Sequence, residues 1–176
     1  QIYDGTAVIT ENGKPAIDSY TAQAGLSLSY SRTVTSQSHF VVGETQQGSS
    51  LRMITQFVSG ETLDYTPASE AYIPIIYHNA LGSYANGYKS TQAASAGQHS
   101  ISSIHTGSSL TNYLDGNAAT SASHTLNATF VNYHIKTGWT QIMTGTTQEV
   151  ILFDSDQTSN RSAIEGNVNA HFQIGN

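Results

Sequence analysis

The stretch Leu26-Ser27-Leu28-Ser29-Tyr30-Ser31 decides the fold class, because large apolar and small polar residues alternate along it without interruption. Successive side chains of a β-strand point to opposite faces, so a period of two predicts a strand with one face buried and one face in water. We expect this strand to continue to Val34.

The same alternation recurs along the whole chain, whereas no stretch shows a convincing helical period of 3.6 residues. Further strands are predicted at 3–10, 39–42, 51–58, 72–77, 99–105, twice within 126–143, at 148–153 and at 167–174. A turn is expected at Asp115-Gly116-Asn117, and the Gly/Ser/Thr-rich stretch 79–123 is expected to contain short, weak strands. Many short strands with Gly-rich turns favour an all-β protein with a single β-sandwich domain, either Ig-like or jelly-roll-like.

The composition is typical of an extracellular protein, so we expect this domain to lie outside the cell. Charged residues make up 10% of the 176 residues, against about 25% in typical soluble proteins. The chain has no Cys, and it begins at Gln1 rather than Met, so we expect a secretion signal to have been removed. The six basic residues are scattered singly, which argues against nucleic acid as a partner. No apolar run approaches the ~20 residues of a membrane span.

A loop near the C-terminus carries the spacing of a calcium-binding loop. Oxygen-bearing side chains alternate along it and end on a carboxylate, as hard cations prefer, and the candidate ligands are Asp154, Asp156, Thr158, Asn160 and Glu165. Ser159 occupies the position where such loops usually have Gly. Calcium is therefore a candidate ligand, and the alternative is a polar connection between two strands.

Signatures of catalysis are absent from the sequence. The seven His residues show no recognised metal-ligand spacing, no G-x-S-x-G nucleophile motif occurs, and pairs of carboxylates cannot be placed from sequence alone. We expect the His side chains to lie on the surface or to be hydrogen-bonded. We expect the protein not to be an enzyme, and a small secreted hydrolase with two carboxylates or a His–acid pair in a cleft is the remaining alternative.

The two ends of the chain have complementary patterns. The first ten residues alternate and are followed by a turn or hinge at 12–15, which divides the chain into a candidate donor strand with hinge, 1–15, and a β-sandwich, 16–176. The donor side chains would be Tyr3, Gly5, Ala7 and Ile9, and the wall of the acceptor groove would be Val168, Ala170, Phe172 and Ile174. An unpaired strand edge can accept a strand from a neighbouring subunit.

In these segments the chain resembles fimbrial subunits without Cys that assemble by donor-strand exchange, or a similar strand-donating filament protein. This resemblance implies a self-polymerising structural subunit of an extracellular filament, fimbria or sheath, located on a cell-surface appendage. The alternative is an adhesin or viral surface domain that binds a carbohydrate or receptor through Tyr-, Asn- and Ser-rich loops. Residues 1–15 discriminate between the two, since packing on their own domain favours the binding module.

Overall fold

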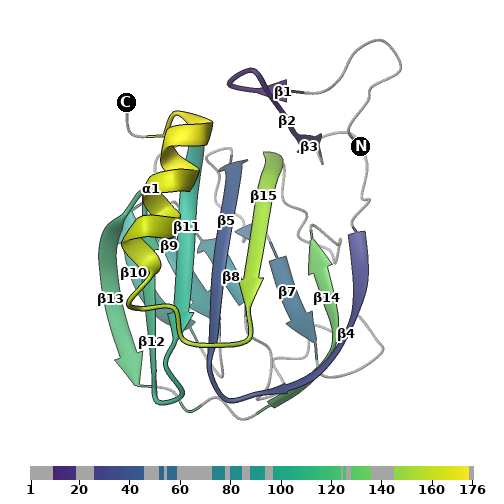
Figure 1. Ribbon diagram of the computed structural model, residues 1–176, viewed down its shortest axis with the longest axis vertical. Helices are drawn as coiled ribbons and strands as arrows, with labels where there is room; N and C mark the ends of the chain where they lie inside the picture. The colour runs from purple at the N-terminus through teal and green to yellow at the C-terminus, as the bar shows by residue number, and fades with distance from the viewer. Residues whose placement is uncertain are drawn as a thin grey trace.

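The computed structural model describes residues 10–18, 26–45, 52–53, 55–58, 73–77, 80–84, 88–93, 97–123, 125, 128–135 and 145–174. Over these residues the protein is a β-sandwich with one helix, as the alternating sequence predicts (Figure 1). The elements are β1 (Thr10–Glu11), β2 (Lys14–Pro15), β3 (Ile17–Asp18), β4 (Leu26–Val34), β5 (Gln37–Thr45), β6 (Arg52–Met53), β7 (Thr55–Val58), β8 (Ile73–Tyr77), β9 (Ala80–Tyr84), β10 (Tyr88–Ala93), β11 (Gly97–His105), β12 (Ser109–Leu114), β13 (Asn117–Ser123), β14 (Ala128–Ile135), β15 (Gly145–Phe153) and α1 (Arg161–Phe172).

The larger layer is a six-stranded sheet in the order β13-β12-β11-β5-β15-β3, with antiparallel pairing throughout. Its three central strands, β5, β11 and β15, each have nine residues. Because β5 pairs with β11 on one side and with β15 on the other, these three strands form the centre of the large sheet.

The other layer consists of two smaller sheets, β10-β9-β8-β6 and β4-β14-β7. β6 pairs with β8 whereas β7 pairs with β14, so two strands that follow each other in the chain belong to different sheets of this layer. Figure 1 shows β8 and β9 passing behind the large sheet, and β7, β14 and β4 continuing to its right.

The predicted C-terminal strand 167–174 is wrong, because residues 167–172 belong to helix α1 and residues 173–174 form the turn that follows it. In Figure 1 the helix lies in front of the large sheet, over β11. Phe172 and Ile174 are buried with Val42 of β5, and Val168 packs against them, whereas Ala170 is exposed. The four residues proposed as the wall of an acceptor groove therefore do not form one face of a strand.

The sequence of this C-terminal segment fits a helical period as well as a period of two. Val168 and Phe172 are four residues apart, as are Arg161 and Glu165, which form an ion pair along the helix. The helix ends at Gln173, which adopts the left-handed conformation (φ 59°) common at helix C-termini. Burial against β5 favours the helical period over the period of two.

The stretch 79–123 contains a long, buried strand, β11, and not only weak ones. From His99 to His105, all seven residues of β11 are buried, because the helix lies on one side and the interior of the sandwich on the other. The predicted turn is confirmed: Asp115 (φ 51°) and Gly116 (φ 83°) connect β12 to β13 with the positive φ angles of a tight hairpin.

In the described part of the chain, no helix has the length and apolar character needed to cross a membrane.

Candidate functional site

The two faces of the large sheet can be assigned from its register. Residues directly opposite in a ladder point to the same side, and Val42 points to the side covered by α1, so its partners Ser100 and Glu149 share that side. This face is called the outer face below. It carries Phe40, Val42 and Glu44 of β5, Gln98, Ser100, Ser102 and Ile104 of β11, and Thr146, Glu149, Ile151 and Phe153 of β15.

A bulge interrupts β15 on this sheet. The register with β5 shifts between Thr147 and Glu149, so Gln148 is an extra residue without a ladder partner. Opposite the bulge lies Gly43, where a Cβ atom would stand 2.6 Å from the Thr146 carbonyl oxygen. The missing side chain at Gly43 allows this close approach of the backbones. Bulges redirect side chains and are frequent beside functional sites.

The redirected Gln148 side chain joins a row of amides that crosses the end of the sheet, here called the amide cluster (Asn12, Gln98 and Gln148). Asn12 Nδ2 donates to Gln98 Oε1 at 2.5 Å, Gln98 Nε2 donates to Gln148 Oε1, and Gln148 Nε2 donates to the Lys14 carbonyl oxygen at 3.2 Å. Gln98 comes from β11 and Gln148 from β15, so the row passes over the intervening strand β5.

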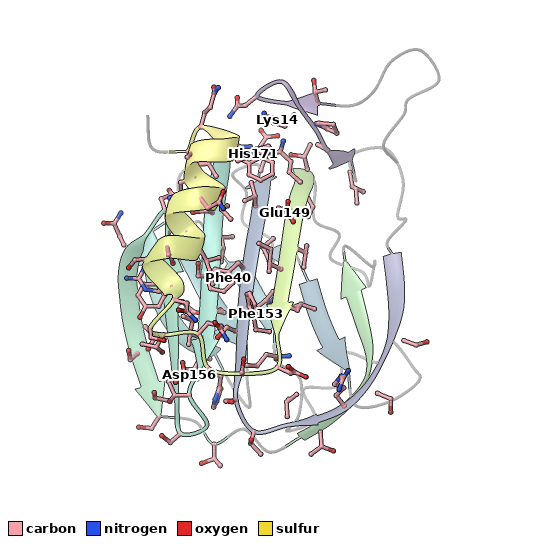
Figure 2. All side chains as sticks on the ribbon, in the orientation of Figure 1. Lys14, Phe40, Glu149, Phe153, Asp156 and His171 are labelled. Carbon is pink, nitrogen blue, oxygen red and sulfur yellow. The ribbon has the colours of Figure 1, made fainter. Side chains whose placement is uncertain are left out.

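Two charged residues adjoin the amide cluster: Lys14, whose carbonyl oxygen accepts from Gln148, and Glu149, which follows Gln148 in the chain. Figure 2 shows Lys14, Glu149 and His171 at the same end of the molecule, where the last turn of α1 and the β1–β2 hairpin stand on either side. The hydroxyl group of Thr146 is buried in this part of the sheet without a hydrogen-bond partner. The arrangement is a polar surface with fixed hydrogen-bonding groups, framed by a helix and a hairpin.

Amide groups at this position suit the recognition of hydroxyl groups. Each side-chain amide has two N–H donors and an acceptor oxygen with two lone pairs, and the bonds within the cluster use only part of this capacity at Asn12 and Gln98. A vicinal diol, such as that of a sugar, donates and accepts in the same way. The cluster is therefore our candidate ligand-binding site.

The hairpin β1–β2 bears on the strand-donor hypothesis. Its turn residues Asn12 and Gly13 have positive φ angles (47° and 71°), as the predicted turn requires, and both Asn12 and Lys14 contact the large sheet of their own domain. Residues 12–14 therefore pack on their own domain, which favours a binding module over a subunit that donates residues 1–15 to a neighbour. The proposed donor residues Tyr3, Gly5, Ala7 and Ile9 lie outside the described residues, so strand donation stays a prediction.

The side chains of the candidate calcium loop contact other protein groups in the structure. Asp156 Oδ1 accepts hydrogen bonds from the Thr158 backbone N–H at 2.8 Å and from its hydroxyl group at 2.6 Å, which shapes the turn before α1. Asp154 lies 3.8 Å from Arg32, Asn160 donates to Gln157, and Glu165 is bound to Arg161 within the helix. Among the residues that the structure describes, no group of three or more His, Asp or Glu side chains is placed to hold a metal ion. The polar connection, ending in a helix, is the better description.

Three His residues are buried in the sheet, and of the two expected environments, surface or hydrogen-bonded, His99 and His105 have the second. His39, His99 and His105 lie on the inner face, opposite the face covered by α1. His99 Nδ1 lies 2.8 Å from Asp115 Oδ2, and His105 Nδ1 accepts from the Gly107 N–H at 3.0 Å. Burial lowers the pKa of His39 to about 3. The sequence could have indicated this burial, because His99 and His105 are an even number of residues from Ile101 and therefore lie on the same face of the strand.

A buried carboxyl group, that of Glu165, lies under the start of the helix. Glu165 points to the sheet, and desolvation raises its pKa, against the opposing effects of a hydrogen bond from Ser102 and of the Arg161 charge. The Arg161 guanidinium lies 4.0 Å from the centre of the Tyr113 ring and also donates to the Gly116 carbonyl oxygen at 3.3 Å. This cluster attaches α1 to the β12–β13 hairpin.

No protein-family model matches this sequence, and no curated protein sequence matches it. Solved structures share its fold. The CBM40 carbohydrate-binding module of the Ruminococcus gnavus IT-sialidase, bound to α2,3-sialyllactose, superposes with a TM-score of 0.58 at 7% identity, over 81% of this chain and 96% of the module.

A heptameric SAP-like pentraxin from Limulus polyphemus has a TM-score of 0.58 at 11% identity, with 86% of this chain and 76% of the pentraxin covered. A Trypanosoma rangeli sialidase has a TM-score of 0.57 at 9% identity, over 84% of this chain but only 26% of the sialidase. At these identities the likeness establishes the class of fold, a β-sandwich of the kind found in carbohydrate-binding modules and pentraxins.

Proposed function

We propose that this chain is an extracellular carbohydrate-binding domain that acts by recognition and not by chemistry. The observation that carries the proposal is the amide cluster, three side-chain amides held in one row by hydrogen bonds, on a fold that matches nearly the whole length of a carbohydrate-binding module. The match to a complete module favours a binding domain over a fragment of a catalytic domain.

The structure of the cluster explains how it would bind. Ordering a long side chain on binding costs about 0.5–1.5 kcal/mol. Gln98 and Gln148 are already tied to each other, and Gln148 is also tied to the Lys14 carbonyl oxygen, so much of this cost has been met in the free protein. A sugar that replaces surface water would then gain hydrogen bonds from amides that are already in position.

A glycan microarray with the purified, fluorescently labelled protein tests the proposal. We expect binding to a restricted set of glycans, and we expect Gln98→Ala and Gln148→Ala each to weaken it at least about tenfold, as for the loss of one or two well-placed hydrogen bonds. Asn160→Ala is the matched control, because this exposed amide bonds only Gln157 beside the start of α1. Folded protein that binds no glycan would refute the proposal, as would binding that both Gln variants retain.

A further inference from the structure

We infer that the imidazole ring of His171 forms an aromatic side of the site at the amide cluster, and that this site takes pyranose sugars that present an apolar C–H face to the ring. This inference rests on the proposed function and specifies its ligand class. A sugar ring carries hydroxyl groups around its edge and C–H groups on its faces. A site that contacts both kinds of group combines fixed polar side chains with an aromatic ring.

The last turn of α1 lies beside the amide cluster. Phe172, in this turn, is buried together with Val42 of β5. Val42 is paired with Ser100, and the next residue of β11 toward the cluster on the same face is Gln98. Two residues along a strand span about 7 Å. The helix therefore ends one outer-face position away from the amides.

His171 is directed from the helix toward the strand that carries Gln148. Successive residues of an α-helix are turned by about 100° around its axis, so His171 lies to one side of Phe172, which faces the sheet. Figure 2 shows that this is the side of β15, where His171 lies near the same end of the sheet as Lys14 and Glu149. The His171 side chain is exposed, so a ligand has access to it.

The ring has a defined orientation although it is exposed. Its centroid lies 4.7 Å from that of the Phe172 ring, and the two planes meet at 82°, which is the edge-to-face arrangement that aromatic pairs prefer. Phe172 is buried and holds the imidazole in place. In either form of an edge-to-face pair, Phe172 covers at most one face of the His171 ring. The second face is left for a sugar, and little side-chain freedom remains to be lost on binding.

Three single variants separate stacking from hydrogen bonding, measured with the glycan that wild-type protein binds most tightly on the array. His171→Ala should weaken binding about two- to tenfold, as expected for one aromatic contact. His171→Phe keeps a ring without nitrogen atoms and should bind within about twofold of wild type. His171→Gln keeps hydrogen-bonding groups without a ring and should weaken binding as much as His171→Ala.

The matched control moves the ring by one position. The double variant His171→Ala/Ala170→His places an imidazole at the neighbouring helix position, which is exposed and is turned further from the sheet. We expect it to bind as weakly as His171→Ala. A direct readout is the NMR spectrum of the same glycan, in which C–H protons of one sugar face should shift upfield through the ring current of wild-type protein and should not do so with His171→Gln.

Binding that His171→Gln retains and His171→Phe loses would overturn the inference, because His171 would then act through a hydrogen bond. Equal losses for these two variants, unchanged binding of His171→Ala, restored binding in the double variant or the absence of upfield shifts would also overturn it. In each of these cases, weakened binding by Gln98→Ala and Gln148→Ala would leave the proposed function intact. Folded wild-type protein that binds no glycan would refute the proposed function, and the inference with it.

Discussion

His99 Nδ1 lies 2.8 Å from Asp115 Oδ2, and the other carboxylate oxygen of Asp115 accepts a hydrogen bond from the Ser100 backbone N–H at 2.9 Å. One turn residue thereby fixes the β12–β13 hairpin to the central strand β11. Loss of a hydrogen bond to a charged, half-buried group costs about 1.5–3 kcal/mol. We expect Asp115→Ala to lower the free energy of unfolding by at least that amount, measured by urea denaturation.

The control for this prediction is Asp115→Asn. Asn tolerates the left-handed conformation of Asp115 (φ 51°) and still accepts the Ser100 N–H bond, so it should retain more stability than Ala. Equal losses for the two variants would show that the side-chain bonds contribute little.

Burial of His39 predicts sensitivity to acid. Its pKa in the folded protein is about 3, against an ordinary value of 6.5, so between these values the unfolded chain binds a proton that the folded protein does not. The stability contributed by the neutral form is present above pH 6.5 and is lost as the pH falls toward 3, by up to about 1.4 kcal/mol per pH unit.

The corresponding variant is His39→Gln, which keeps a polar side chain that does not titrate. We expect it to be less stable than wild type at pH 7.5, since His39 is fully buried and bonded, but to show a shallower fall in stability between pH 6.5 and 4.5. Urea denaturation at intermediate pH values measures both. Parallel stability profiles for the two proteins would contradict the assignment.

Replacing Gly43 or Gly166 by Ala should change the free energy of unfolding in opposite directions. A Cβ at Gly43 would lie 2.6 Å from the Thr146 carbonyl oxygen, so Gly43→Ala must push β15 away and displace the bulge at Gln148. We expect a loss of about 1–3 kcal/mol, together with weaker glycan binding. Gly166 lies on the exposed side of α1 with open space around it, so Gly166→Ala should raise stability by about 0.5–1 kcal/mol. The opposite order of stabilities would refute this explanation of the bulge.

Arg161 is expected to be essential for the helix, because it neutralises the buried Glu165. Removing one member of a buried ion pair typically costs about 3–5 kcal/mol. We predict a loss of this order for Arg161→Met at pH 7. Burial raises the pKa of Glu165, so its carboxylate is unfavourable at neutral pH, and protonation relieves this cost as the pH falls through the raised folded value toward the ordinary 4.5.

The defect of Arg161→Met should therefore be smaller at pH 5 than at pH 7. Thermal denaturation of both proteins at the two pH values measures it. A defect that grows on acidification would show that the charge of Glu165 is not its cause.

Strand positions were predictable from the sequence because most strands alternate, and an alternating strand needs only one buried face. Segments such as 26–34 and 148–153 were found for this reason. The strand β11 was underestimated, since both of its faces are covered and Ser residues fill positions that a pattern of large apolar residues would mark. The helix was missed because Val168 and Phe172 fit a period of two as well as a helical turn.

The candidate site could not be predicted in the same way. Asn12, Gln98 and Gln148 are distant in sequence, and they meet only because β11 and β15 flank β5 and because a bulge redirects Gln148. A bulge depends on one extra residue relative to a partner strand, and the sequence does not reveal which strands are partners. The turn at 12–13, with its Asn-Gly pair, was the one part of the site with a local signal.

The most direct test of the central claim is a ¹⁵N NMR titration that follows the side-chain amide signals of the wild-type protein during addition of a glycan selected on the array. We predict that the signals of Asn12, Gln98 and Gln148 shift together and saturate with one dissociation constant, while the signal of Asn160 stays in place. Saturating shifts confined to other parts of the protein, with these three signals unchanged, would contradict the assignment of the amide cluster as the binding site.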